Sequence, residues 1–159
     1  MKTVVTGAAG FIGRWVVKDL VERGHDVLGF DNLSNGSRDN VEEFSNEPSF
    51  ELVKGDVRNE REVAEVLEDA DVCIHLAAKI DVQESIEDPK AHFEANIVGT
   101  QNILEACRKN GTRLSLVGTC MVYDVANSDG GIDEEHPVKP ASPYAGSKLA
   151  SENMAESYY

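Results

Sequence analysis

Two kinds of segment alternate along this chain, and they differ in the spacing of their hydrophobic residues. Short apolar runs rich in β-branched residues occupy positions 3–6, 25–31, 50–53, 71–76 and 114–118. Such runs are typical of strands that a parallel sheet buries on both faces. The stretches between them are longer, and their apolar residues recur at the spacing of one helix face. The pattern therefore predicts a strand followed by a helix, five times over.

The first three predicted helices are short. Their apolar positions are, in chain order, Ile12, Val16, Val17 and Leu20; Val41 and Phe44; and Val63, Val66 and Leu67. Gly24 follows the first helix and can end it with a left-handed residue. The second helix, within 37–48, is polar and acidic and is expected at the surface, where Pro48 ends it.

The longest predicted helix starts near Pro89 and ends at Asn110-Gly111. It carries two apolar lines, one at Phe93, Ile97, Leu104 and Cys107 and the other at Ala95, Val98, Ile103 and Ala106. Two lines predict burial on two sides, one against the sheet and one against a neighbour such as a second subunit. Ser142 and Pro143 are suited to cap and start a last helix. Because such a pairing would cover the second apolar line, we expect a homodimer that pairs through 89–110 and 142–159.

The alternation predicts the α/β fold class and one domain over 1–159. Short connections and right-handed crossovers give a Rossmann-like doubly wound parallel sheet, with strand order 3-2-1-4-5 and helices on both faces. Ligands of such sheets bind at the carboxyl ends of the strands. The residues expected at that edge are Gly7, Asp31, Asp56, Ala77, Thr119 and Tyr144.

Charge narrows the class of partner. The formal net charge of −14 repels nucleic acid and anionic lipid, so local donors must hold any anionic ligand. The acidity serves solubility, or it reflects a salt-adapted or thermophilic source. Apolar runs are too short to span a membrane, and because the first predicted strand begins directly after Met1-Lys2 we expect no signal peptide. We expect neither membrane nor nucleic-acid binding, and no metal site.

Cysteine usage points to a compartment. Cys73, Cys107 and Cys120 are odd in number and lie in segments predicted as regular structure. Reduced thiols fit this pattern better than a disulfide framework, so we expect a cytoplasmic protein.

Three glycines at the end of the first strand are the first candidate site. Gly7, Gly10 and Gly13, with Phe11 and Ile12 between them, read as strand, tight turn and helix start. Glycine lets the backbone approach a ligand, and the helix N-terminus offers free N–H groups to a phosphate. A flexible turn explains the glycines equally well when they are taken alone.

Acidic residues follow the second and third strands. Asp31 lies about twenty residues beyond the glycines, where a ribose 2′-hydroxyl needs an acceptor, and a carboxylate there favours NAD over NADP. Asp56 can accept from the adenine amine while Val57 packs against the ring; an ordinary turn aspartate is the alternative. After the fourth strand, the small residues of Leu76-Ala77-Ala78 permit close approach of a cofactor. We expect His75 to be a strand histidine with a hydrogen-bond partner.

Tyr144 and Lys148 are four residues apart, so both project from one helix face. A neighbouring ammonium and a nicotinium charge would lower the pKa of the tyrosine and let it act as a base. Lys148 can also hold the nicotinamide ribose, and the Thr119 hydroxyl can bind the substrate oxygen. The alternative is a core tyrosine beside a solvated lysine.

Seven ordered motifs carry a family resemblance. They lie at 6–13, 31–34, 55–56, 75–78, 96–100, 122–123 and 142–148. Together they resemble the extended short-chain dehydrogenase/reductases, and within them the NAD-dependent nucleotide-sugar epimerases and dehydratases, most of all the UDP-glucose (UDP-galactose) 4-epimerases. The resemblance spans essentially the whole chain.

The resemblance implies roles for several residues. Tyr144 would be the catalytic base, with Lys148 and Thr119 as its partners. Such enzymes take a hydride from the sugar C4 onto NAD, form a 4-keto sugar, and return the hydride to the opposite face. The resemblance further implies a UDP-linked substrate. It places Asn32 and Asn96 among the cofactor contacts and Ser85, Thr119, Cys120, Met121 and Tyr144 near substrate.

Two departures from the family pattern matter. Dehydratases of the family place Asp-Glu after the catalytic threonine, whereas this chain has Cys120-Met121. Met121 cannot transfer a proton, which favours epimerisation over dehydration or decarboxylation. We expect Cys120 to be a small buried filler rather than a reactive thiol.

Length is the second departure. The family's C-terminal substrate domain is absent from this chain, so we expect a fragment that is incomplete for turnover alone, and a naturally short protein that binds NAD without turnover is the alternative. A non-catalytic NAD-binding sensor or scaffold is therefore an alternative of another class.

Overall fold

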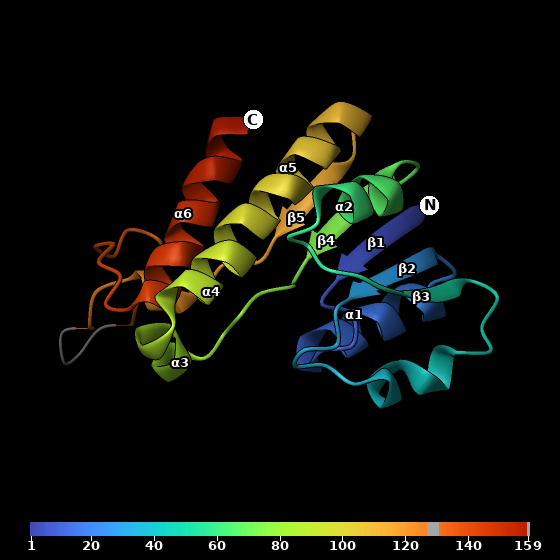
Figure 1. The fold of residues 1–159 in the computed structure, drawn as a ribbon, viewed down its shortest axis with the longest axis horizontal. Coiled ribbons are helices and arrows are strands. Elements are labelled where there is room, and N and C mark those ends of the chain that lie inside the picture. The colour runs from blue at the N-terminus through green and yellow to red at the C-terminus, as the bar shows by residue number, and fades with distance from the viewer. Residues whose placement is uncertain (127–130, 159) are drawn as a thin grey trace.

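A five-stranded parallel sheet organises the computed structural model, which describes residues 1–126 and 131–158. The strands are β1 (Lys2–Thr6), β2 (Asp26–Asp31), β3 (Phe50–Lys54), β4 (Val72–His75) and β5 (Arg113–Leu116). Their order is β3-β2-β1-β4-β5, which confirms the predicted topology (Figure 1). Thr6 pairs with Phe30 on one side and with His75 on the other, so the carboxyl ends of the central strands lie level.

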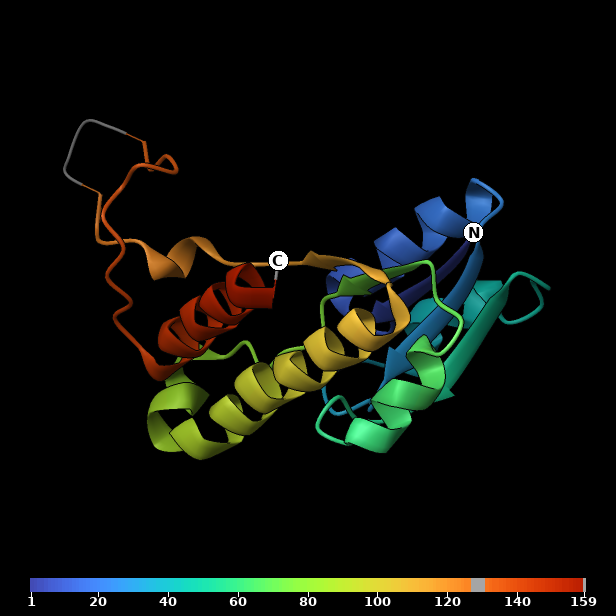
Figure 2. The same cartoon turned by 90° about the horizontal axis from the view of Figure 1, so that it is seen from above.

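Helical segments cover both faces of the sheet, as the doubly wound prediction requires (Figure 2). On one face lie α1 (Phe11–Glu22) and the 3-10 segment η1 (Arg38–Phe44); on the other lie α2 (Glu60–Leu67) and α5 (Gly99–Asn110). Successive residues of β1 point to opposite faces, so Val4 joins the core under α2 and α5 while Val5 joins the core under α1.

The predicted long helix is one helical run in three parts. It consists of α4 (Pro89–Phe93), the π-helical segment η2 (Glu94–Val98) and α5. The short α3 (Val82–Glu87), which lies just before it, was not predicted because six residues hold too little periodicity. Asp81 and Asp88 start α3 and α4 by accepting from the backbone N–H groups of Glu84 and Ala91.

The two apolar lines of this helix do not divide as predicted. Four residues drawn from both lines are buried within the chain, namely Ile103, Leu104, Ala106 and Cys107. The exposed apolar residues are Phe93 and Val98, each 43% exposed, which also come from both lines. The π turn between them shifts the helix phase, so a line drawn at constant spacing crosses from one face to another.

Helix ends follow the local sequence signals. Gly24 and Gly111 have φ of +76° and +70° and end α1 and α5, which confirms the helix ends predicted at these two glycines. The last helix, α6 (Pro143–Tyr158), begins where Ser142 Oγ accepts a 3.1 Å hydrogen bond from the Ala145 N–H. It packs beside α3, α4, η2 and α5. Tyr159, which the predicted pairing segment includes, lies outside the described residues.

All three cysteines are free thiols. Cys73 and Cys107 are buried, but Cys120 is exposed, so its prediction as a buried filler is wrong. It lies in the 3-10 turn η3 (Cys120–Val122), which buries Val122 and turns the preceding side chains outward. Over the described residues, we find no helix with the length and apolar character needed to cross a membrane.

Candidate cofactor and active site

The glycine loop joins β1 to α1 by a turn that side chains would obstruct. Gly7 has φ of +69°, and its N–H donates to the Phe30 carbonyl at 2.8 Å. A Cβ on Gly7 would lie 2.8 Å from the Ala77 nitrogen, and one on Gly13 would overlap the Gly7 carbonyl. Gly10 caps α1 without a side-chain hydrogen bond. The loop therefore leaves the first N–H groups of a twelve-residue helix available to an anion.

A cavity of about 390 Å³ runs along the carboxyl edge of the sheet from this loop to α6. Every residue predicted to bind the cofactor lines it except Asn96: Gly7, Gly10, Phe11, Ile12, Gly13, Asp31, Asn32, Asp56, Val57, Leu76, Ala77, Ala78, Tyr144 and Lys148. Segments that are far apart in sequence thus meet at one edge, as the sheet topology predicts.

Asp31 links the end of β2 to the glycine loop. Its Oδ2 accepts from the Ala9 N–H at 3.0 Å and its Oδ1 from the Leu33 N–H at 2.8 Å. A carboxylate oxygen can accept more than one hydrogen bond, so Asp31 keeps the capacity to bind a ribose hydroxyl. The same side chain therefore shapes the loop and lines the cavity.

The Asp56 carboxylate accepts more hydrogen bonds than that of Asp31. Its Oδ1 accepts from the backbone N–H and Nε of Arg58 at 2.9 and 3.0 Å, and its Oδ2 from Arg58 Nη2 at 2.7 Å and Asn32 Nδ2 at 3.0 Å. The hydrogen bonds from the Arg58 side chain hold the pKa of Asp56 well below its usual range. Because four donors already use the carboxylate, an adenine amine would have to replace one of them.

His75 lies behind the cavity wall. Its Nδ1 is 2.6 Å from Thr6 Oγ and its Nε2 is 3.1 Å from Thr100 Oγ. Burial, with a smaller contribution from the positive charge of Lys148, lowers the pKa of His75 to about 3. The imidazole is therefore neutral at neutral pH, and the prediction of a hydrogen-bonded strand histidine is confirmed.

Helix α6 brings Tyr144 and Lys148 to the far end of the cavity. Both side chains are buried, and Lys148 Nζ donates to the Val117 carbonyl at 2.7 Å. Burial lowers the pKa of Lys148 from its ordinary value. With only 7% of its surface exposed, Lys148 is not the solvated lysine of the alternative interpretation.

Four other predicted residues lie outside the cavity lining. Thr119 caps η3, where its Oγ accepts from the Met121 N–H at 3.3 Å, and Met121 and Cys120 are exposed. Ser85 is buried in α3 and donates to the Val82 carbonyl at 2.6 Å. The two residues that precede Thr119 in the chain, Val117 and Gly118, do line the cavity.

Sequence reasoning missed two cations in the lining, Arg58 and Lys79. Arg58 follows Asp56 in a turn after β3, and Lys79 follows Ala77-Ala78 after β4, where it forms an ion pair with Glu84. Their positions just past strand ends were the available signal. The other missed lining residues are Phe30, Ser34, Asn35, Gly36, Gly55, Ile80, Ala95, Val117 and Gly118.

Comparison with known proteins assigns this arrangement to a family. Residues 4–159 match the family described as GDP-mannose 4,6 dehydratase. The UDP-glucose 4-epimerase of Mycolicibacterium smegmatis is 39% identical over 171 residues, which cover 100% of this chain and 52% of that protein. This chain belongs to the extended short-chain dehydrogenase/reductase family. The resemblance predicted from the motifs is confirmed.

Solved structures of relatives agree with the assignment. Pal from Bacillus thuringiensis matches with a TM-score of 0.96 at 48% identity, over 100% of this chain and 52% of that one. The dTDP-glucose 4,6-dehydratase DesIV of Streptomyces venezuelae, crystallised with NAD, matches with a TM-score of 0.94 at 34% identity, over 99% and 51%. The chain thus spans about half the length of these family members. Both an epimerase and a dehydratase are among them, so membership establishes an NAD-dependent nucleotide-sugar family and not a single reaction.

Proposed function

We propose that this chain is the cofactor-binding portion of an NAD-dependent nucleotide-sugar 4-epimerase that acts on a UDP-linked sugar. One observation carries the proposal. The buried Tyr144 and Lys148 line the same cavity as the glycine loop, so a ligand that spans the cavity meets both. The absence of a Cβ at Gly7 and Gly13 lets the backbone of the loop pack closely, and this supports a pyrophosphate site at the start of α1.

The residues of the chain would divide the work along the cavity. The loop N–H groups would bind the pyrophosphate, Asp31 the adenosine ribose, and Asp56 with Val57 the adenine. Bound NAD would supply the acceptor for the hydride that leaves the sugar C4. Tyr144 would take the proton of the C4 hydroxyl, and the Lys148 ammonium would favour its phenolate form.

Positions 120 and 121 favour epimerisation over dehydration. Elimination of a sugar hydroxyl needs a further acid and base, and neither an exposed Cys120 nor Met121 provides such a pair. Epimerisation needs only the proton and hydride exchanged at C4. A dehydratase or decarboxylase of the same family is the next candidate, because DesIV has a closely similar fold.

A second class of function is the binding of NAD without turnover, as a sensor or scaffold. It would use the same glycine loop and Asp31, which line the cavity, and it would need no proton transfer by Tyr144. We further propose a cytoplasmic location, on the ground of the three free thiols.

Product analysis tests the proposed reaction. The full-length enzyme that contains this chain is loaded with NAD and offered UDP-glucose, UDP-galactose and their N-acetyl and uronic forms, and the products are resolved by chromatography. We expect interconversion of a C4 epimer pair. A 4-keto-6-deoxy product would identify a dehydratase instead. NAD binding in calorimetry without conversion of any sugar would support the sensor.

A further inference from the structure

The π-helical segment η2 creates an unusual junction at Asn96. In this turn the Asn96 carbonyl accepts from two side-chain hydroxyls, Thr100 Oγ at 2.6 Å and Ser151 Oγ at 2.7 Å. Isolated π turns within helices are less favourable than regular helix and frequently occur at functional sites. The turn lies beside the cavity, because Ala95 is one of the lining residues.

The Asn96 side chain joins two parts of the cavity wall. Its Oδ1 accepts from the Lys79 N–H at 2.8 Å, while its Nδ2 donates to the Lys79 carbonyl at 2.9 Å and to Ser147 Oγ at 2.9 Å. The amide uses both of its donors and is buried. Lys79 lies in the wall formed by residues 76–80, and Ser147 lies in α6, so one side chain links the two.

Ser147 stands between the two proposed catalytic residues. It is fully buried, and its Oγ donates to the Tyr144 carbonyl at 2.7 Å. A hydroxyl has a single proton, so this bond leaves the Ser147 oxygen to accept from Asn96. The direction of both hydrogen bonds is thereby determined, and an alanine at this position could make neither.

We propose that Ser147 is a positioning residue, which sets the distance between the 76–80 wall and the Tyr144–Lys148 face through its hydrogen bond to Asn96. The inference rests on the proposed function only in taking NAD as the ligand of the cavity. The bond joins residues 51 positions apart, so it links walls that no local element connects.

Ser151 supplies a matched control. It is also fully buried in α6 and also contacts Asn96, but its single hydroxyl proton is shared between the carbonyls of Asn96 at 2.7 Å and Ser147 at 2.9 Å, and the Asn96 amide is left untouched. Ser147→Ala and Ser151→Ala therefore each remove one buried hydroxyl from the same helix. They differ in whether α6 keeps its hydrogen bond to the Asn96 amide, and through that amide its connection to Lys79.

Two measurements on the 159-residue chain test the proposal. Hydrogen exchange should be faster at the Lys79 amide in Ser147→Ala than in Ser151→Ala. The two substitutions should nevertheless lower the free energy of unfolding, measured in urea, by similar amounts. NAD affinity in calorimetry should fall about three- to tenfold in Ser147→Ala and stay near the wild-type value in Ser151→Ala, as expected for one lost hydrogen bond.

Equal effects of the two variants on exchange would overturn the proposal, since Ser147 would then contribute only to stability. An unchanged NAD affinity in Ser147→Ala would overturn it as well. If the wild-type chain bound no NAD, the proposed function would fail, while the exchange experiment would still decide on the Ser147–Asn96 connection.

Discussion

At the scale of single residues, two different interactions determine the protonation states of ionisable side chains near the cavity. His75 is kept neutral because burial makes its protonated form costly, and two threonine hydroxyls satisfy its ring nitrogens. Asp56 is kept charged because Arg58 and Asn32 donate to it. Each side chain at these strand ends therefore has one protonation state at neutral pH, neutral for His75 and negative for Asp56.

The pKa of His75 predicts acid sensitivity. The folded pKa of about 3 lies below the ordinary 6.5, so between these values the unfolded chain binds a proton that the folded chain does not. The contribution to stability is complete above the unfolded pKa and is lost as pH falls. We expect acidification from about pH 7.5 to about pH 5 to lower the free energy of unfolding of the wild type by roughly 2 kcal/mol more than that of His75→Gln.

Urea unfolding of the two proteins at both pH values measures this difference. Carboxylates titrate in both proteins and cancel in the comparison. The same loss of unfolding free energy in the variant would show that His75 does not carry the effect.

The role of Tyr144 is also tested by a single substitution. Tyr144→Phe removes the phenolic oxygen that would take the proton, so in the full-length enzyme the reduction of bound NAD by a UDP-sugar should slow by about 10²- to 10⁴-fold. NAD affinity should change little. Nicotinamide absorbance follows the reduction, and calorimetry follows the binding.

Tyr123→Phe is the control for that experiment, because Tyr123 is only partly buried and is not among the cavity-lining residues. Retention of the reduction rate in Tyr144→Phe would remove Tyr144 from the mechanism.

At the scale of elements, glycine serves the β1–α1 loop and α6 differently. A Cβ on Gly13 would meet the Gly7 carbonyl, whereas one on Gly146 would meet no atom within 4 Å beyond its chain neighbours and the nearby backbone of its own helix. Gly13 therefore permits a close backbone approach that shapes the cavity, and Gly146 only adds conformational freedom to a helix.

Alanine at these two positions should have opposite effects. We expect Gly13→Ala to lower the free energy of unfolding by about 1–3 kcal/mol and to abolish NAD binding, because the loop must shift to make room. Gly146→Ala should raise the free energy of unfolding by about 0.5–1 kcal/mol, since alanine favours the helix. Chemical denaturation and calorimetry measure both, and a Gly13→Ala protein that still binds NAD would contradict the pyrophosphate assignment.

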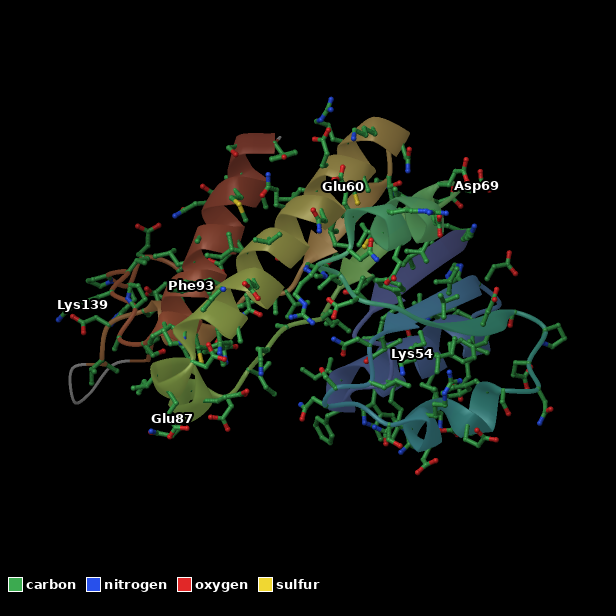
Figure 3. The ribbon with its side chains drawn as sticks, in the orientation of Figure 1. Lys54, Glu60, Asp69, Glu87, Phe93 and Lys139 are labelled. Carbon is green, nitrogen blue, oxygen red and sulfur yellow. The ribbon has the colours of Figure 1, made fainter. Side chains whose placement is uncertain are left out.

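At the scale of the whole molecule, apolar side chains remain uncovered beside the helices that we expect to pair. Ile86 on α3, Phe93 on α4 and Val98 at the end of η2 are all exposed (Phe93 is labelled in Figure 3). These elements adjoin α6 or continue into α5, so one interface would cover them.

We expect the chain to sediment as a dimer at micromolar concentration and the double variant Phe93→Glu/Val98→Glu to sediment as a monomer, because paired carboxylates cannot be buried at the interface. Ile12→Glu, an exposed apolar position on the opposite side of the sheet, is the control and should remain dimeric. A monomeric wild type would contradict the interface.

Local patterns in the sequence determined the order of elements, the strand order and the edge at which the cavity lies. Strand runs, capping residues and glycines act over a few residues, so their meaning survives without knowledge of the fold. The same locality made the glycine loop, Asp31 and the Tyr144–Lys148 pair visible in advance.

Only the tertiary structure decided which partners the polar groups take. Four donors surround Asp56, Val117 accepts from Lys148, and Asn96 faces Lys79 and Ser147 and does not line the cavity. Several of these bonds join residues that are 17 to 51 positions apart, and Asn96 itself lies in a π turn that helical periodicity does not reveal. Such partners depend on the packing of whole elements, which spacing along the chain does not encode.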